Sequence, residues 1–256
     1  MDNYKKYLLY LVLIMTSLAC DKDPDNTIPP EEVTCETTLT DIDGNTYLVV
    51  KIGDQCWMAE NLRTTHYADG TPISLGEPGM SLWEDYTSKY YFNYDSLHLE
   101  EFGALFELLL AKSKLYTWAA ATNLEGDGSA NGIVQGVCPD GWHLPNKSDW
   151  EELINFVGIE TAGQSLKSDN PVYWNNDIPD MEGTDEYGFN SIASGGRDSF
   201  GAWYIFDLYA FYWSSSTFED ESWRVWTPFL VNYSKEVQWL GYSKSNSFCV
   251  RCVKNK

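Results

Sequence analysis

Side chains with acid–base or metal-binding chemistry are scattered along this chain instead of meeting at catalytic spacing. The histidines are His66, His98 and His143, and none is paired with another at the HxxxH spacing of a helical metal site. Cys249 and Cys252 have the CxxC spacing of redox and zinc sites, but residues three apart in an extended strand face opposite sides. We therefore favour structural roles, with these two cysteines in separate disulfides.

One short run, Trp57–Arg63 (WMAENLR), concentrates polar side chains among apolar ones. Glu60 or Arg63 could act on a substrate, and His143, within PDGWHLP, could act as a base. We favour the alternative of a buried polar network, because loops that cannot pair their own backbone need such partners. Its expected members are Glu60, Asn61, Arg63 and His143. The GxSxG, HExxH, Walker and dinucleotide-binding motifs are absent from the sequence, so we predict no catalytic residues.

Calcium is the one cofactor that the sequence suggests. Oxygen-bearing side chains alternate along residues 123–131, as in the first part of a calcium loop. They are Asn123, Glu125, Asp127, Ser129 and Asn131. Val134 replaces the acid that would ligate from the twelfth position, so we favour a solvated loop and expect no cofactor, with calcium as the alternative.

Composition restricts the partners of the chain. Its 256 residues carry a formal net charge of −21, which repels nucleic acids and anionic bilayers. Aromatic residues make up 15% of the chain, and we expect most of these rings to fill a loop-rich core, while others serve binding. The candidate ligand-binding rings lie in the carboxy-terminal part and are Trp203, Tyr204, Tyr209, Tyr212, Trp223, Trp226, Tyr233, Trp239 and Tyr242.

Residues 1–20 have the character of an export signal. A pair of lysines precedes the apolar stretch Leu8–Ala19, which is too short to span a bilayer as a helix. The sequence SLAC that ends at Cys20 resembles a bacterial lipobox, although Ser17 stands where a large aliphatic residue is usual. We predict that Cys20 is acylated and is the only membrane attachment, and that the acidic, proline-containing residues 21–36 form an extended tether.

Apolar periodicity predicts an amino-terminal hairpin and one well-defined helix. Strands are expected at Thr37–Ile42 and Tyr47–Ile52 around the turn Asp43-Gly44, followed by a strand at Cys56–Met58. The helix is predicted from residues that recur at i, i+3, i+4 and i+7, namely Trp150, Leu153, Ile154 and Val157.

The ends of this helix, and two further helices, are predicted from local signals. Ser148 and Glu151 fit a capping box, and Gly158 is a helix stop. Shorter or less regular helices are expected at Phe102–Ala111 and Thr161–Ser168. Strands are expected at Trp203–Phe206, Phe211–Trp213, Trp223–Val225, Phe229–Val231, Val237–Leu240 and Phe248–Val253. Few helices among many short strands predict the α+β class.

Four aromatic blocks follow one another in a fixed order, each bounded by turn residues. They are Asp41–Arg63, Cys138–Trp150, Phe211–Ser216 and Phe248–Val253. With this order the chain resembles the Fibrobacter succinogenes major paralogous domain family, a family of secreted and surface proteins of Bacteroidetes and Fibrobacter. The resemblance implies a C-type-lectin-like fold over residues 37–256, with short antiparallel strands, two main helices, long loops and an insertion near residues 97–114. It implies no biochemical activity, because the family has no established common function.

Five cysteines follow Cys20, which predicts two disulfides and one free thiol in an oxidising compartment. The candidates are Cys35, Cys56, Cys138, Cys249 and Cys252. The connectivity stays open in the sequence. The family resemblance implies that Cys249 occupies a position where the family often has serine. We prefer one bridge between the carboxy-terminal strand and an earlier block.

Three functions fit these observations. The first is a surface-exposed outer-membrane lipoprotein whose non-catalytic domain binds a glycan through its aromatic rings. The second is a structural or adhesive subunit that binds another surface protein. The third is an extracellular hydrolase, which ranks last because no pair of acids stands out as catalytic in so acidic a chain.

Overall fold

The predicted amino-terminal hairpin is confirmed in the structure, a computed structural model that describes residues 33–94, 110–126, 132–175, 177–204 and 206–256. Strand β1 (Thr38–Thr40) pairs antiparallel with β2 (Thr46–Ile52). Gly44 adopts a φ of 82° in the turn, a backbone conformation that glycine reaches without a steric penalty. Strand β3 (Gln55–Met58) then pairs with β2, and all its residues are buried.

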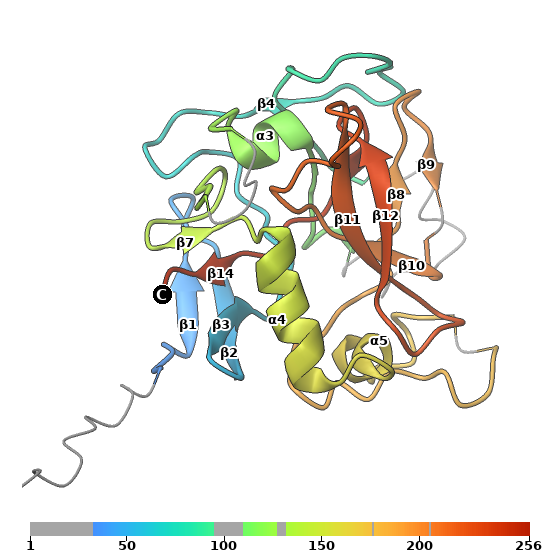
Figure 1. The fold of residues 1–256 in the computed structure, drawn as a ribbon. Helices are drawn as coiled ribbons and strands as arrows, with labels where there is room; N and C mark the ends of the chain where they lie inside the picture. The colour runs from blue at the N-terminus through green and yellow to red at the C-terminus, as the bar shows by residue number, and fades with distance from the viewer. Residues whose placement is uncertain (1–32, 95–109, 127–131, 176, 205) are drawn as a thin grey trace, which may run out of the picture. The chain divides into compact units, whose positions relative to one another are not determined.

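The carboxy-terminal end of the chain completes this sheet. Strand β14 (Val253–Lys254) lies between β3 and β7 (Trp142–His143), which gives the order β1-β2-β3-β14-β7 (Figure 1). Val253 pairs with Trp57 on one side and with His143 on the other. The sheet therefore cannot form until residues about 200 positions apart have met.

The single strand predicted at Phe248–Val253 is wrong, because two short strands in different sheets occupy this stretch. The second sheet has the order β4 (Ser74–Leu75), β5 (Tyr90–Phe92), β6 (Leu115–Thr117), β13 (Ser247–Phe248), β8 (Gly196–Arg197) and β9 (Trp203–Tyr204). Residues 249–252 connect this sheet to β14 in the first one. The expectation of antiparallel strands throughout is also wrong at one edge, where β4 and β5 are parallel.

The third sheet consists of β10 (Tyr209–Phe211), β11 (Arg224–Val231) and β12 (Gln238–Ser243). The two strands predicted at Trp223–Val225 and Phe229–Val231 are one continuous strand. Its pairing with β12 runs unbroken from Arg224 to Phe229. Pro228 breaks the sequence pattern but not the strand, and its carbonyl accepts a hydrogen bond from the N–H of Tyr212.

Helix α4 (Lys147–Val157) confirms the predicted helix and its buried face, but the predicted cap is wrong. The capping residue is Asn146, whose side chain accepts a hydrogen bond from the N–H of Asp149, while the Asp149 carboxylate accepts one from the N–H of Asn146. This capping box lies two residues before the predicted pair. Ser148 is exposed within the first turn, and Gly158 ends the helix as predicted.

Two short helices complete the described elements. Helix α5 (Ala162–Leu166) lies within the predicted range Thr161–Ser168. Helix α3 (Trp118–Thr122), which the sequence did not predict, begins with Thr117 as its cap, and all its residues are buried. The predicted helix at Phe102–Ala111 and the insertion near residues 97–114 lie largely outside the described residues. Residues 33–256 form one compact unit, mainly β with few helices, which fits the α+β class in this broad sense.

The core is built largely from aromatic rings. Trp57 and Trp150 pack with ring centroids 4.9 Å apart, and Phe189 lies edge-on to both. A second group surrounds Phe248, whose ring lies 4.5 Å from Trp213 and 4.9 Å from Phe211. Large flat rings cover much apolar surface with few rotatable bonds, so they stabilise a scaffold that has little regular structure.

Two disulfides confirm the predicted number and the preferred carboxy-terminal bridge. Cys35 pairs with Cys56, and Cys138 pairs with Cys252 across 114 residues. Closing a loop of about 100 residues stabilises a fold by about 4–5 kcal/mol in the chain-entropy model. The expectation of a disulfide at Cys249 is wrong. Its thiol is free and buried, and burial raises its pKa.

The observed cap of α4 gives a prediction with an internal control. Replacing Asn146 by Ala removes the acceptor for the Asp149 N–H and is expected to lower the free energy of unfolding by about 1 kcal/mol. Ser148→Ala changes an exposed residue two positions away and is expected to stay within about 0.5 kcal/mol of the wild type. Urea denaturation measures both, and a larger effect at Ser148 would contradict the assignment.

Candidate functional site

An open cleft of about 400 Å3 is the best candidate for a ligand site, and we call it the aromatic cleft. It is lined by Trp83, Glu84, Tyr86, Ser199, Trp223, Ser243 and Ser245. Trp83 and Trp223 keep 59% and 43% of their surface exposed, which is unusual for such large apolar side chains. The lining combines apolar ring faces with hydroxyl groups and one carboxylate, as ligand pockets generally do.

Trp83 lies on a loop that is fixed to the β8–β9 connection. The N–H of Leu82 donates to the carbonyl of Ser199 over 2.7 Å, and the Ser81 hydroxyl donates to the same oxygen over 3.2 Å. Phe200 then stacks on Trp83, with ring centroids 4.8 Å apart and planes within 15°. Phe200 is itself 62% exposed, so the two rings form a stacked, nearly parallel pair beside the cleft.

A buried cation holds the base of this loop. Arg197 is fully buried, and its Nη2 donates to the carbonyl of Met80. Its guanidinium carbon lies 3.9 Å from the centroid of the Phe92 ring, a favourable cation–π contact. Burial lowers the pKa of Arg197 to about 10, which still leaves it cationic at neutral pH. Arg197 thus attaches the base of the loop to strand β8.

The two acids in the loop have different roles. Asp85 accepts hydrogen bonds from the N–H groups of Thr87 and Ser88. Burial alone would raise its pKa, but the hydrogen bonds from Ser88 and Thr87 outweigh that and hold the pKa of Asp85 below its usual range. Glu84 instead lines the cleft in an exposed position with a φ of 59°, a backbone conformation rare outside glycine.

The opposite wall comes from the ends of β11 and β12. Ser243 and Ser245 share a hydrogen bond of 2.7 Å between their hydroxyl oxygens. The carbonyl of Trp223 accepts a hydrogen bond of 2.9 Å from the N–H of Lys244. Among the residues that line the cleft, Glu84 is the one acid, whereas glycoside hydrolysis ordinarily requires two carboxylates. The lining therefore offers one of the two carboxylates that such hydrolysis uses.

The nine rings proposed from the sequence do not form one surface. Trp223 lines the aromatic cleft, whereas Tyr212 is fully buried against Trp150 and offers no face to a ligand. Tyr233 is exposed beyond the other end of β11, where its hydroxyl contacts that of Tyr209. The other rings are half-buried and are Trp203, Tyr204, Trp226, Trp239 and Tyr242.

Sequence reasoning missed the other half of the cleft. Trp83, Tyr86 and Phe200 lie in loops outside the proposed set. The available signal was local, because Trp83 stands between turn residues and acids in GMSLWEDYTS, with no alternating apolar neighbours that would bury it. An isolated large ring in such a polar turn is a candidate for exposure.

Glu60, Asn61, Arg63 and His143 do not converge on one site. Both ring nitrogens of His143 are occupied, Nδ1 by Asn255 at 2.7 Å and Nε2 by Asp149 at 3.1 Å. Arg63 lies over the Tyr47 ring and donates to the carbonyl of Thr46. These contacts connect loops to strands.

Glu60 and Asn61 line a polar cavity of about 80 Å3 together with Arg251, a residue that sequence reasoning did not single out. Arg251 is buried and donates from Nε to Asn61 and from Nη2 to the carbonyl of Asn190, each over 2.9 Å. Its Nη1 donates to the carbonyl of Phe189. A cavity this small is well below the range of about 300–1,000 Å3 typical of ligand pockets.

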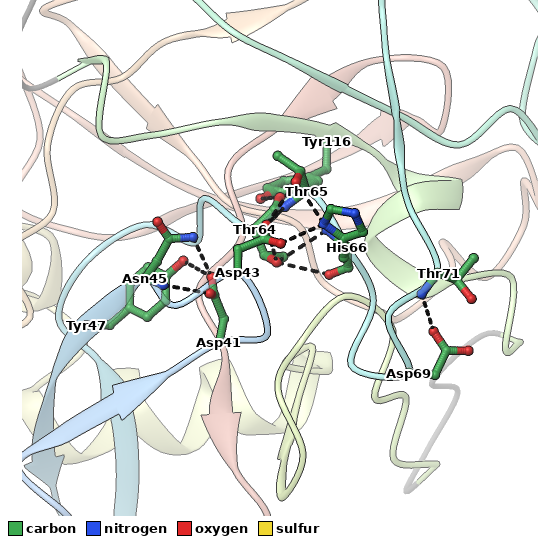
Figure 2. A network of polar contacts seen from close by, with 10 residues as sticks. All are labelled: Asp41, Asp43, Asn45, Tyr47, Thr64, Thr65, His66, Asp69, Thr71 and Tyr116. Atoms are coloured by element: carbon green, nitrogen blue, oxygen red, sulfur yellow. Dashed lines mark hydrogen bonds and ion pairs between the residues drawn. The ribbon is translucent and has the colours of Figure 1, made fainter.

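A further polar network fixes the amino-terminal hairpin to the following loop (Figure 2). The Tyr47 hydroxyl donates to Asp41 over 2.5 Å, and Asp43 accepts from the N–H of Thr65 over 2.5 Å. His66 lies next to this pair, with Nδ1 2.6 Å from Asp43. The Thr65 hydroxyl also contacts Nδ1, whereas a catalytic triad uses separate ring nitrogens for the acid and the nucleophile. The network therefore connects the hairpin to the loop and does not have the geometry of a triad.

The proposed calcium positions are only partly described. Asn123 accepts a hydrogen bond of 2.6 Å from Lys89, and Glu125 accepts one from the N–H of Gly136. Asp127, Ser129 and Asn131 lie outside the described residues. Within the described ranges, no group of three or more His, Cys, Asp or Glu side chains could hold a metal ion. In the same ranges, no helix has the length and apolar character needed to cross a bilayer.

The described residues thus define a disulfide-stapled, mainly β domain whose loops carry an aromatic cleft. Residues 50–254 match the Fibrobacter succinogenes major domain, so the chain belongs to this family, as its aromatic blocks indicated. No curated protein and no solved structure matches the chain.

The contact between the two loops of the cleft can be tested at Gly201. A Cβ built there would lie 2.7 Å from the backbone of Gly79 and Met80, and the φ of 93° already disfavours other residues. Gly201→Ala is expected to lower the free energy of unfolding by about 1–3 kcal/mol more than Gly70→Ala. Gly70 has a similar φ of 85° but open space around it, so it controls for backbone strain. Equal effects in urea denaturation would show that the loops do not touch as described.

Proposed function

We propose that this protein is a non-catalytic carbohydrate-binding lipoprotein and that the aromatic cleft is its ligand site. The observation that carries the proposal is the pair of exposed indoles, Trp83 and Trp223, in one cleft with several hydroxyl groups. Sugar rings have apolar C–H faces and a polar rim. Such a ligand would stack on the indoles and bond the hydroxyls of Ser199, Ser243 and Ser245 at the same time.

Two features favour a glycan over a protein partner. Protein partners usually cover a broad apolar patch of several hundred Å2, whereas here aromatic residues and serines line one concave cleft. The rings are also held in place before binding, because Trp83 stacks on Phe200 and its loop is bonded to Ser199. Such preorganisation reduces the entropy lost on binding a small, weakly held ligand. An adhesive or structural subunit is the second function and becomes preferred if no glycan binds.

The finer fold and the location belong to the same proposal. A C-type-lectin-like fold is supported by the pairing of β14 with β3, which joins the two ends of the domain. Acylation of Cys20 would place the domain at the outer membrane, with residues 21–36 as the tether to a surface-exposed domain. The net charge of −21 fits a protein that is attached by lipid and not by attraction to anionic headgroups.

The lipid anchor has a direct test. Cells that express the full chain are fed an alkyne fatty acid, and its incorporation into the protein is measured. We expect labelling of the wild type and none of Cys20→Ala, because the acyl chains require this thiol. Ser17→Leu supplies the usual lipobox residue and is expected to keep the label. Continued labelling of Cys20→Ala would refute the anchor.

The ligand site is tested by removing its rings one at a time. Trp83→Ala and Trp223→Ala should each weaken binding by up to about tenfold, since a stacked ring contributes about 0.5–1.5 kcal/mol beyond its buried area and about 1.4 kcal/mol is tenfold. A glycan array run with calcium and again with chelator finds the ligand, and calorimetry then measures the affinity of each variant. We expect binding that survives the chelator.

Tyr233→Ala is the matched control. Tyr233 is one of the exposed rings proposed from the sequence. It follows the end of β11, whereas Trp223 precedes its start. Tyr233→Ala should leave the affinity for the glycan unchanged, while Trp83→Ala and Trp223→Ala reduce it. If the wild type binds no glycan on the array, the carbohydrate proposal fails. If Tyr233→Ala weakens binding as much as Trp83→Ala does, the site is elsewhere.

A further inference from the structure

A second cleft of about 280 Å3 adjoins the aromatic cleft, and we call it the Lys244 cleft. It is lined by Trp118, Leu124, Gly126, Thr217, Ser222 and Lys244. The ammonium of Lys244 lies 4.1 Å from the centroid of the Trp118 ring, and the Trp118 indole N–H donates to the carbonyl of Ser214. Leu124 is largely exposed and adds an apolar wall.

The two clefts share one backbone wall. Ser222 lines the Lys244 cleft and Trp223 lines the aromatic cleft, although they are consecutive residues. On the neighbouring segment, Lys244 belongs to one cleft while Ser243 and Ser245 belong to the other. The hydrogen bond from the Lys244 N–H to the Trp223 carbonyl joins these two segments. The backbone of these two segments therefore separates the clefts, and we call this backbone pair the ridge.

We propose that both clefts bind one ligand, a linear neutral oligosaccharide that crosses the ridge at Trp223. This inference rests on the proposed function and specifies its ligand class. The aromatic cleft, of about 400 Å3, is near the lower end of the range of about 300–1,000 Å3 seen for ligand pockets, and the Lys244 cleft, of about 280 Å3, is just below it. Either cleft alone would therefore hold only a short part of an oligosaccharide. The indole of Trp223, partly exposed at the ridge, would carry the sugar unit between them.

The charge around the clefts favours a neutral chain. Glu84 lines the first cleft, and the exposed acids Glu219 and Asp220 lie in the segment between Thr217 and Ser222 of the second. Together with the net charge of −21, they oppose a ligand that carries a carboxylate or sulfate on every unit. Lys244 is the one cation among the residues that line the two clefts, and its ammonium already contacts the Trp118 ring.

Binding across two linked subsites makes affinity depend on chain length. A dimer fills one cleft, whereas a longer chain engages the second as an intramolecular step at high effective concentration. We therefore expect a hexamer to bind the wild type about tenfold or more tightly than the corresponding dimer. The probes are ladders of two to six units of neutral β-1,4-glucan, β-1,4-mannan, α-1,4-glucan and N-acetylglucosamine chains, measured by calorimetry with the full-length protein.

Two variants on the far side of the ridge identify the second subsite. Ser222→Trp fills the Lys244 cleft from an exposed position and should reduce the gain from chain length to about twofold, without changing dimer binding. Ser222→Ala is its matched control and should keep the full gain. Leu124→Ala, which removes part of the apolar wall without adding bulk, should weaken hexamer binding alone.

The outcomes separate this inference from the proposed function. If dimers and hexamers bind the wild type equally well, the second subsite is refuted while the carbohydrate site stands. If no ladder binds at any length and the array is also empty, the proposed function has failed. Tighter binding of a uronic acid or sulfated chain than of every neutral chain would overturn the assignment of a neutral ligand.

Discussion

The fold depends on burying one cation, the guanidinium of Arg251, in the segment that joins two sheets. This segment runs from β13 to β14, and the charge inside it is offset by donation to Asn61 and to the carbonyls of Phe189 and Asn190. The rings of Phe189 and Tyr212 lie within 4.4 and 5.5 Å of the guanidinium. A buried charge without such partners would be strongly unfavourable, so these contacts stabilise the path of the segment through the core. The Cys138–Cys252 disulfide then fixes the residue next to Arg251.

The same physical solution recurs at the aromatic cleft. Arg197 is buried, packs on the Phe92 ring and donates to a loop carbonyl, that of Met80. In both places a guanidinium donates to the carbonyl of a loop that lacks regular hydrogen bonding, although Nε and Nη1 of Arg197 have no hydrogen-bond partner among the described residues. Arginine suits this role because its five donors point in fixed directions and its flat face stacks on aromatic rings. A loop-rich scaffold can therefore hold Trp83 in one position without a helix or strand beneath it.

Local patterns in the sequence predicted what local forces determine. The β1–β2 hairpin and the buried face of α4 follow from apolar periodicity and turn residues alone. The cap of α4 did not, because Asn146 and Ser148 are both good capping residues, and the choice depends on Asp149 also meeting His143 across space. Similarly, Cys249 and Cys252 are both buried in the connection between β13 and β14, and only Cys252 meets a partner, Cys138, from a distant part of the chain. The cleft was half-predicted, since Trp223 was chosen from composition but Trp83 joins it through contacts between distant loops.

The exposure of the cleft is itself an argument for function. Trp83 and Phe200 stack on each other in solvent while the other large rings nearby, such as Phe248, are buried, so the fold is able to bury aromatic rings. Glu84 adds a backbone conformation that disfavours any residue but glycine, next to the ring that remains exposed. Features that lower local stability, such as an exposed indole or an unfavourable backbone conformation, are concentrated at functional sites. Two such features lie in adjacent residues, on a loop that hydrogen bonds attach to Arg197 and Ser199, and the ligand that we propose would account for both.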